Sequence, residues 1–169
     1  MMSRRPHLFL SALALGLVAF TAPAPAQTPI GAWELTCIEP ATSSPSCTAL
    51  QSVGGDGTAV VLRATTIGFT IELLLGPERG SPASVAVYRA SRTVATFGSG
   101  RISYIGGNSA VRRFRLAGSS DVRNVLQAMT GASSLAIAVD YADGTSETLN
   151  LRTSNTSDLF AAMHEVVPF

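Results

Sequence analysis

Short runs of alternating apolar and polar residues, separated by turns rich in glycine and proline, recur along this chain of 169 residues. The clearest run covers residues 67–75, where Ile67, Phe69, Ile71, Leu73 and Leu75 alternate with Gly68, Thr70 and Glu72. A period of two residues is typical of a strand that buries one face. Asp143-Gly144, which separates two further runs, predicts a tight hairpin. These patterns predict a mainly β structure.

Helical spacing occurs in only two segments, one around Val122–Met129 and one around Leu159–Met163. Ser119, Ser120 and Asp121 are candidate caps of the first helix, Gly131 its expected end, and Asn155 or Ser157 caps the second. We expect further short strands at residues 33–37, 47–53, 59–63, 85–88, 93–97, 101–105, 112–116, 135–141 and 145–152. Because strands and helices do not alternate regularly, the expected fold is β-rich α+β, an antiparallel β-sandwich-like domain with two short packed helices.

The first 26 residues have the features of a signal peptide. Arg4 and Arg5 precede an apolar run at residues 8–20, and Ala24-Pro25-Ala26 offers an A-x-A cleavage site. A spanning helix needs about 20 apolar residues, more than this run supplies. We therefore expect cleavage after Ala26 and one domain at residues 27–169, periplasmic or secreted, with no membrane span. The alternative is an uncleaved N-terminal anchor.

Cys37 and Cys47 are the only cysteines, and both lie in the part that we expect to be exported. A pair in an oxidising compartment predicts a disulfide, and the alternatives are a metal site or a free nucleophile. Zinc normally takes four ligands, whereas His164 is the only histidine of residues 27–169. We favour the disulfide, and expect Trp33, the only tryptophan, to be buried against it and the 67–75 strand.

The charge of the expected mature domain excludes one class of partner. All positive charges are arginines, and without Arg4 and Arg5 ten of the twelve remain against eleven acidic residues, a formal net charge of −1. A near-neutral domain has no electrostatic reason to bind nucleic acid.

Arg112, Arg113 and Arg115 form a local positive cluster in the sequence. At strand period Arg113 and Arg115 share one face, while Arg112 joins Phe114 and Leu116 on the other. Arginine suits carboxylate and phosphate partners because its guanidinium offers a planar fork of donors. Arg113 and Arg115 are therefore candidate binding residues, and the alternative is an ordinary solvated strand face.

Residues suited to catalysis are few. His164, beside Glu165 near the end of the second helix, is explained more simply by an interaction with the helix dipole. The acidic residues are dispersed, no serine lies in a G-x-S-x-G motif, and the glycine-rich segments 98–100 and 106–108 lack the lysine of a phosphate-binding loop. We expect a non-catalytic binding protein without metal or cofactor, although a triad assembled in space stays open.

Two segments, Gly31-Ala-Trp-Glu-Leu-Thr-Cys37 and Cys47-Thr-Ala-Leu-Gln51, resemble the opening of the invasion-associated locus B family, exported proteins of alphaproteobacteria. Leu-Leu-Leu-Gly at residues 73–76 and the order of elements over residues 119–166 are also similar to that family. Leu159-Phe-Ala-Ala162 lacks the glycine of a family helix motif, and a second cysteine pair common in the family is absent, which indicates a divergent member.

The resemblance implies a periplasmic or secreted β-sandwich-like protein without known catalysis, which acts at the cell envelope or in host interaction. Its partner would be an unidentified protein or envelope component. Two alternatives stay open: a periplasmic enzyme inhibitor of the lysozyme-inhibitor type, and a hydrolase with an unrecognised site.

Overall fold

The structure, a computed structural model, describes residues 26–39 and 44–168. The predicted signal peptide lies outside the described residues except for Ala26, so its cleavage stays a prediction. The described chain is mostly β, with two α-helices. Its elements are β1 (Thr28–Ile30), β2 (Trp33–Ile38), β3 (Ser46–Ser52), β4 (Ala59–Thr65), β5 (Gly68–Leu75), β6 (Pro82–Arg89), β7 (Arg92–Gly98), the 3-10 turn η1 (Ser99–Arg101), β8 (Ile102–Gly107), β9 (Arg112–Leu116), α1 (Ser119–Thr130), β10 (Ser134–Tyr141), β11 (Ser146–Arg152) and α2 (Thr156–Val166).

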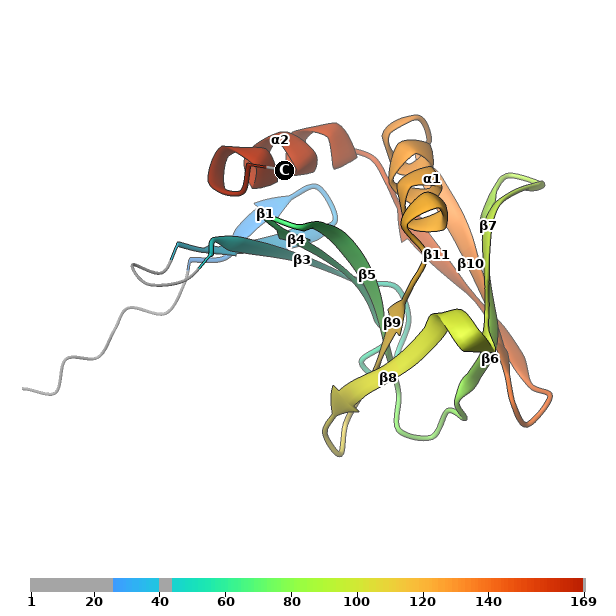
Figure 1. Cartoon of the computed structure of the whole chain (residues 1–169). Helices are drawn as coiled ribbons and strands as arrows, with labels where there is room; N and C mark the ends of the chain where they lie inside the picture. The colour runs from blue at the N-terminus through green and yellow to red at the C-terminus, as the bar shows by residue number, and fades with distance from the viewer. Residues whose placement is uncertain (1–25, 40–43, 169) are drawn as a thin grey trace, which may run out of the picture.

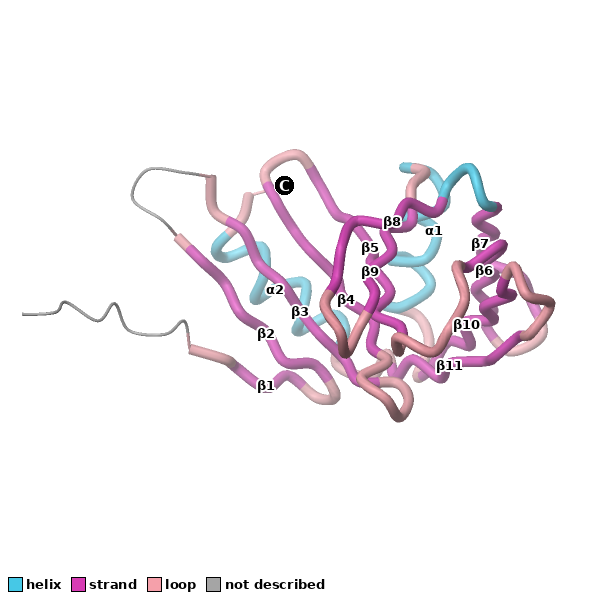
Figure 2. Tube along the Cα trace, turned by 90° about the horizontal axis from the view of Figure 1, so that it is seen from below, coloured by secondary structure: helices cyan, strands magenta, loops and turns pink. Residues whose placement is uncertain are grey.

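The strands form two open antiparallel sheets, which confirms the predicted β-rich α+β, sandwich-like class. Sheet A has the order β1-β2-β3-β4-β5-β9-β8, and sheet B has the order β11-β10-β6-β7. Figure 1 shows sheet A bending strongly between β5 and β8, and Figure 2 shows the two sheets side by side. The long excursion of the chain through β6 and β7 places β9 beside β5, although about 40 residues separate them in the sequence.

The core lies between the sheets and under the two helices. Helix α2 contacts β2 and β3, while α1 contacts β7, β10 and β5 and stands between the sheets (Figure 1). In most strands the apolar residues of the alternating pattern lie on the buried side. The helices contribute the apolar faces that the spacing of their apolar residues predicted. The core includes Trp33, Val60, Leu62, Leu73, Leu75, Phe97, Phe114, Met129, Leu135, Val139, Leu151, Leu159 and Met163.

The predicted disulfide and the predicted hairpin turn are both confirmed. Cys37 and Cys47 are direct cross-strand partners of β2 and β3, their Cα atoms are 4.1 Å apart, and they form a disulfide. Asp143-Gly144 closes the β10–β11 hairpin, where Gly144 has a φ of 83° and the Asp143 carboxylate accepts the Thr145 N–H at 2.9 Å. Trp33 is buried with 1% exposure, as expected.

Two local predictions are wrong. Ile67 was assigned to the buried face of a strand, but β5 begins at Gly68 and Ile67 lies in the preceding turn with 97% exposure. The caps expected for α1 are also wrong, because Gly118 occupies its N-cap position and makes no side-chain capping bond. Asn155 does occupy the N-cap position of α2, as expected, but without a side-chain capping bond. The chain enters α1 through Gly118 at a φ of 127°, a conformation that residues other than glycine rarely adopt.

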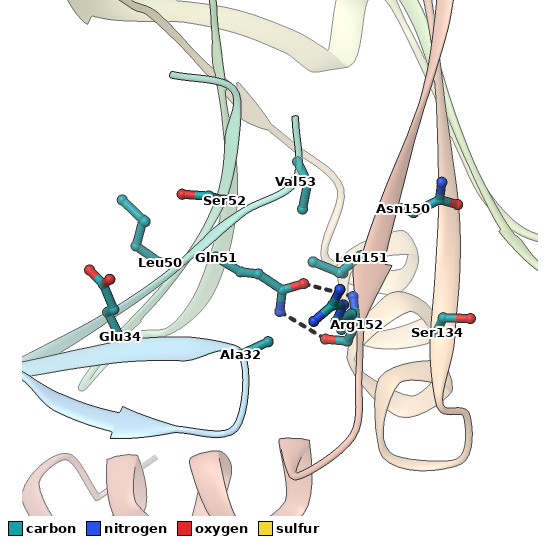
Figure 3. Close-up of a pocket in the computed structure, with 10 residues that line it drawn as sticks. All are labelled: Ala32, Glu34, Leu50, Gln51, Ser52, Val53, Ser134, Asn150, Leu151 and Arg152. Atoms are coloured by element: carbon teal, nitrogen blue, oxygen red, sulfur yellow. Dashed lines mark hydrogen bonds between the residues drawn. The ribbon is translucent and has the colours of Figure 1, made fainter. Parts of the chain in front are cut away.

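A buried glutamine connects the two sheets. The Gln51 side-chain amide donates to the Arg152 carbonyl at 2.8 Å, and its carbonyl accepts the Arg152 N–H at 2.7 Å (Figure 3). Gln51 on β3 is 2% exposed and therefore substitutes for a strand partner at the edge of β11. It forms the floor of a cavity of about 480 Å³ whose lining carries both Glu34 and Arg152.

Candidate functional site: arginines around a buried carboxylate

Arg113 and Arg115 share one face of β9, as the sequence predicted, and both contact a buried carboxylate that the prediction missed. Arg113 Nη2 donates to Glu72 Oε2 at 2.6 Å, and Arg115 Nη2 donates to Glu72 Oε1 at 3.3 Å. Glu72 lies on β5 and its side chain is fully buried. The two arginines are therefore not an unpaired solvated face.

A third arginine completes what we call the Glu72 cluster, made of Arg63, Glu72, Arg113 and Arg115. Arg63 on β4 has its Nε 3.8 Å from Glu72 Oε1. Strand register produces this arrangement: Glu72 lies directly opposite Arg115, and each of the other two arginines is offset by two residues from it. Such diagonal positions lie within reach of long side chains.

The cluster occupies the face of sheet A that turns away from α2. Phe69, on the opposite face of β5, packs against Phe160 of α2 with ring centroids 5.4 Å apart. Glu72 lies three residues after Phe69, and therefore on the other side of the strand. The arginine side chains are 34% (Arg63), 37% (Arg113) and 44% (Arg115) exposed, so they cover Glu72 and form the outer surface themselves.

The arginines hold Glu72 in its charged form. Burial by itself would raise the pKa of the Glu72 carboxyl, because it disfavours the charged state. The hydrogen bonds from Arg113 and Arg115, with the charges of Arg113 and Arg63, outweigh burial and place the pKa below its ordinary value. At neutral pH the cluster therefore contains one carboxylate and three guanidinium groups.

This composition leaves positive charge and hydrogen-bond donors for a ligand. Three arginines against one carboxylate give the cluster a formal charge of +2. Each guanidinium carries five N–H donors, and within the described residues Arg113 and Arg115 each use only one of them on a side-chain acceptor. An anion on this surface would meet donors whose positions are fixed by Glu72.

Arg112 lies on the opposite face of β9, as predicted, and has a structural role. Its guanidinium donates to the Arg79 carbonyl at 2.9 Å and to Ser81 Oγ at 3.1 Å. The same group lies over the rings of Phe114 and Tyr104, at 5.1 Å and 5.6 Å from their centroids. Arg112 thus ties β9 to the loop before β6 and does not join the cluster.

His164, the histidine weighed as a catalytic candidate, does not belong to the Glu72 cluster. His164 lies exposed in the last turn of α2, on the helix side of sheet A, away from the Glu72 cluster. In the described part of the chain, no three His, Cys, Asp or Glu side chains group closely enough to hold a metal ion. Within residues 26–39 and 44–168, no helix is both long and apolar enough to cross a membrane.

A sequence signal for the missed residues exists. Glu72 is the single charged residue of β5, and Arg63 is the single charged residue of β4, two otherwise apolar strands in the middle of sheet A. Isolated charges of opposite sign in neighbouring central strands predict a buried pair, because an unpaired charge there would be too costly.

No family model, curated protein or solved structure matches this chain.

Proposed function

We propose that this protein is an exported, non-catalytic binding protein that recognises an anionic group through Arg63, Arg113 and Arg115. The observation that carries the proposal is the excess of charge around Glu72, three guanidinium groups on one carboxylate with all three partly exposed. A pair built only for stability would need one arginine. The additional guanidinium groups suit a phosphate or carboxylate of a protein or envelope component.

Preorganisation supports the same role. Arginine loses side-chain entropy when it is fixed, and a ligand that meets fixed guanidinium groups does not have to supply that ordering. Glu72 fixes Arg113 and Arg115 before any ligand arrives, since both are bonded to its carboxylate. The resemblance to the invasion-associated locus B family and the disulfide favour a periplasmic or secreted setting for this binding.

The experiment follows the arginine Nε–H resonances by NMR while inorganic phosphate is added. We expect the resonances of the cluster arginines to shift in a saturable, salt-sensitive manner. Arg92 is the matched control, because it is an exposed arginine of sheet B with no side-chain partner among the described residues. Shifts at the cluster no larger than the shift at Arg92 would refute the proposal.

Two variants separate binding from a purely structural role. Glu72→Gln raises the formal charge of the cluster by one and should tighten phosphate binding, whereas Arg115→Gln should weaken it. Both variants remove a contact of the same network and should lower the melting temperature. A cluster that served stability alone would give two destabilised variants with the same phosphate affinity.

The enzyme-inhibitor alternative draws on the same surface. A retaining or inverting glycosidase carries two carboxyl groups in its cleft, and exposed guanidinium groups are suited to enter it. If the protein inhibits lysozyme, wild-type protein will slow the lysis of a cell-wall suspension and Arg115→Gln will not. Equal lysis rates with and without wild-type protein would exclude lysozyme as the target.

A further inference from the structure

A cavity lies next to the Glu72 cluster, where β9 ends. The last pairing of β5 with β9 joins Ile71 to Leu116, so Gly68, Phe69 and Thr70 of β5 pair with β4 alone. Beyond Leu116 the chain leaves sheet A and enters α1 (Figure 1). The space between the end of β9, the start of β5 and α1 is a cavity of about 620 Å³, within the range of small-molecule sites.

The walls of this cavity combine an apolar surface with positive charge. Phe69 and Leu116 come from sheet A, Val122 and Leu126 from α1, and the exposed side chain of Ile67 stands at the rim. The charged residues of the lining are Arg115 and Arg123, and no acidic residue belongs to it. Arg123 is exposed on α1 and has no ion pair among the described residues.

A buried hydroxyl in the lining lacks a partner. Thr70 Oγ1 is inaccessible to solvent and makes no hydrogen bond in the described structure. Buried polar atoms are almost always hydrogen-bonded, and an exception needs an explanation. Thr70 lies on the same face of β5 as Glu72 and lines the cavity together with Arg115. The wall beside Arg115 therefore contains a hydroxyl whose hydrogen-bond partner is absent from the described structure.

We infer that the cavity binds a single-chain anionic amphiphile, a molecule with an acidic headgroup and an unbranched apolar chain. The headgroup lies between Arg115 and Arg123, and the chain lies against Phe69, Leu116 and Leu126. This inference rests on the proposed function, because Arg115 belongs to both sites. It adds the apolar half of the ligand, which the Glu72 cluster cannot recognise.

The test uses laurate as the probe, measured by isothermal titration below its critical micelle concentration. Acetate carries the same headgroup without the chain, and dodecyl maltoside carries the chain without the charge. We expect saturable laurate binding at least about tenfold tighter than that of either control, as the loss of one charge-assisted hydrogen bond implies for the neutral probe. Comparable binding of laurate and dodecyl maltoside would overturn the inference.

Variants assign the binding to this cavity. Arg123→Gln removes an exposed charge without an ion-pair partner, so it should leave the melting temperature unchanged and weaken laurate binding by about tenfold. Ile67→Ser removes the exposed apolar rim and should weaken laurate but not phosphate binding. Arg92→Gln should change neither. Unchanged laurate affinity in Arg123→Gln would refute the assignment.

The outcomes also separate this inference from the proposed function. If phosphate shifts the cluster arginines but laurate binds no better than acetate, the amphiphile inference fails and the anion site stands. If neither phosphate nor laurate binds, the proposed function fails first and the inference fails with it.

Discussion

Replacing Arg113 or Glu72 by methionine tests whether the buried ion pair is coupled as the structure indicates. Methionine is unbranched and uncharged, so it removes the charge but still fills much of the space of the side chain that it replaces. The three variants are Arg113→Met, Glu72→Met and the double substitution, each compared with the wild type by its free energy of unfolding. The two residues are linked by the 2.6 Å hydrogen bond from Arg113 Nη2 to Glu72 Oε2.

The expected magnitudes come from burial and from the remaining partners. Removing one member of a buried ion pair typically costs about 3–5 kcal/mol, because it leaves an uncompensated charge. Here Arg115 and Arg63 stay within 3.3 and 3.8 Å of Glu72, and the Arg113 side chain is 37% exposed. We therefore expect Arg113→Met to cost about 2–3 kcal/mol.

Glu72→Met should cost less, about 1–2 kcal/mol, because the arginines left behind can turn toward water. The double variant contains no stranded carboxylate and should lose no more than about 2 kcal/mol. The coupling energy of the cycle is then about 2 kcal/mol.

The pH dependence gives an independent readout. The pKa of Glu72 is lowered in the folded protein, so its contribution to stability is present above the unfolded pKa, near 4.5, and is lost as the pH falls through the folded pKa. Urea denaturation from pH 7 to pH 3 should therefore show the difference between wild type and Glu72→Met shrinking on acidification. In Arg113→Met fewer charges oppose the effect of burial on the pKa of Glu72, so this pKa is lowered less. The difference in stability between Arg113→Met and the double variant should therefore vary less with pH.

Two results would refute this reasoning. Additive single substitutions, with a coupling energy below about 0.5 kcal/mol, would mean that the contact contributes nothing specific. Parallel stability curves for wild type and Glu72→Met across this pH range would mean that the folded pKa of Glu72 is not lowered.

Three further predictions concern the scaffold. Replacing Cys37 and Cys47 with serine should lower the free energy of unfolding by about 2–3 kcal/mol, since the bridge closes a short loop, and two reactive thiols in the native protein would contradict the bridge. Trp33→Ala should cost about 3–5 kcal/mol, and native tryptophan emission resembling that of free tryptophan in water would contradict its burial. Gln51→Leu should cost about 2 kcal/mol because it leaves the Arg152 N–H and carbonyl without their side-chain partners, and a chemical-denaturation midpoint equal to that of the wild type would contradict this link between the sheets.

The fold was predictable where local chemistry decides it. Alternation located most of the strands, Asp143-Gly144 marked its hairpin, and the apolar spacing around Val125 and Leu159 marked both helices. Ile67 shows the limit of alternation, because a turn residue adjacent to a strand continues the pattern by chance. The pairing of β5 with β9 was not predictable, since it depends on how sheet B folds back between them.

The candidate site shows the same division. That Arg113 and Arg115 share a face follows from the strand period alone. That Glu72 is buried beneath them depends on the pairing of β5 with β9. This pairing brings Glu72 against Arg113 and Arg115, which follow it by 41 and 43 residues in the chain. On β5 taken alone, Glu72 looks like the solvated side of a half-buried strand. Only the two neighbouring strands, β4 and β9, reveal that its environment is three guanidinium groups.

Burying a carboxylate with arginine partners in the middle of a sheet gives little net stability, because apolar side chains of similar volume are often as stable, so the fold must gain something else from it. The register offers one gain: a one-residue slip of β9 against β5 would move both arginines to the apolar face and leave Glu72 without a partner. The geometry offers a second, since the same carboxylate fixes Arg113 and Arg115 and leaves their remaining donors without a side-chain acceptor among the described residues. The first gain requires one arginine, and the second requires more than one. The presence of three therefore favours a surface that binds an anion over a device that only sets the register.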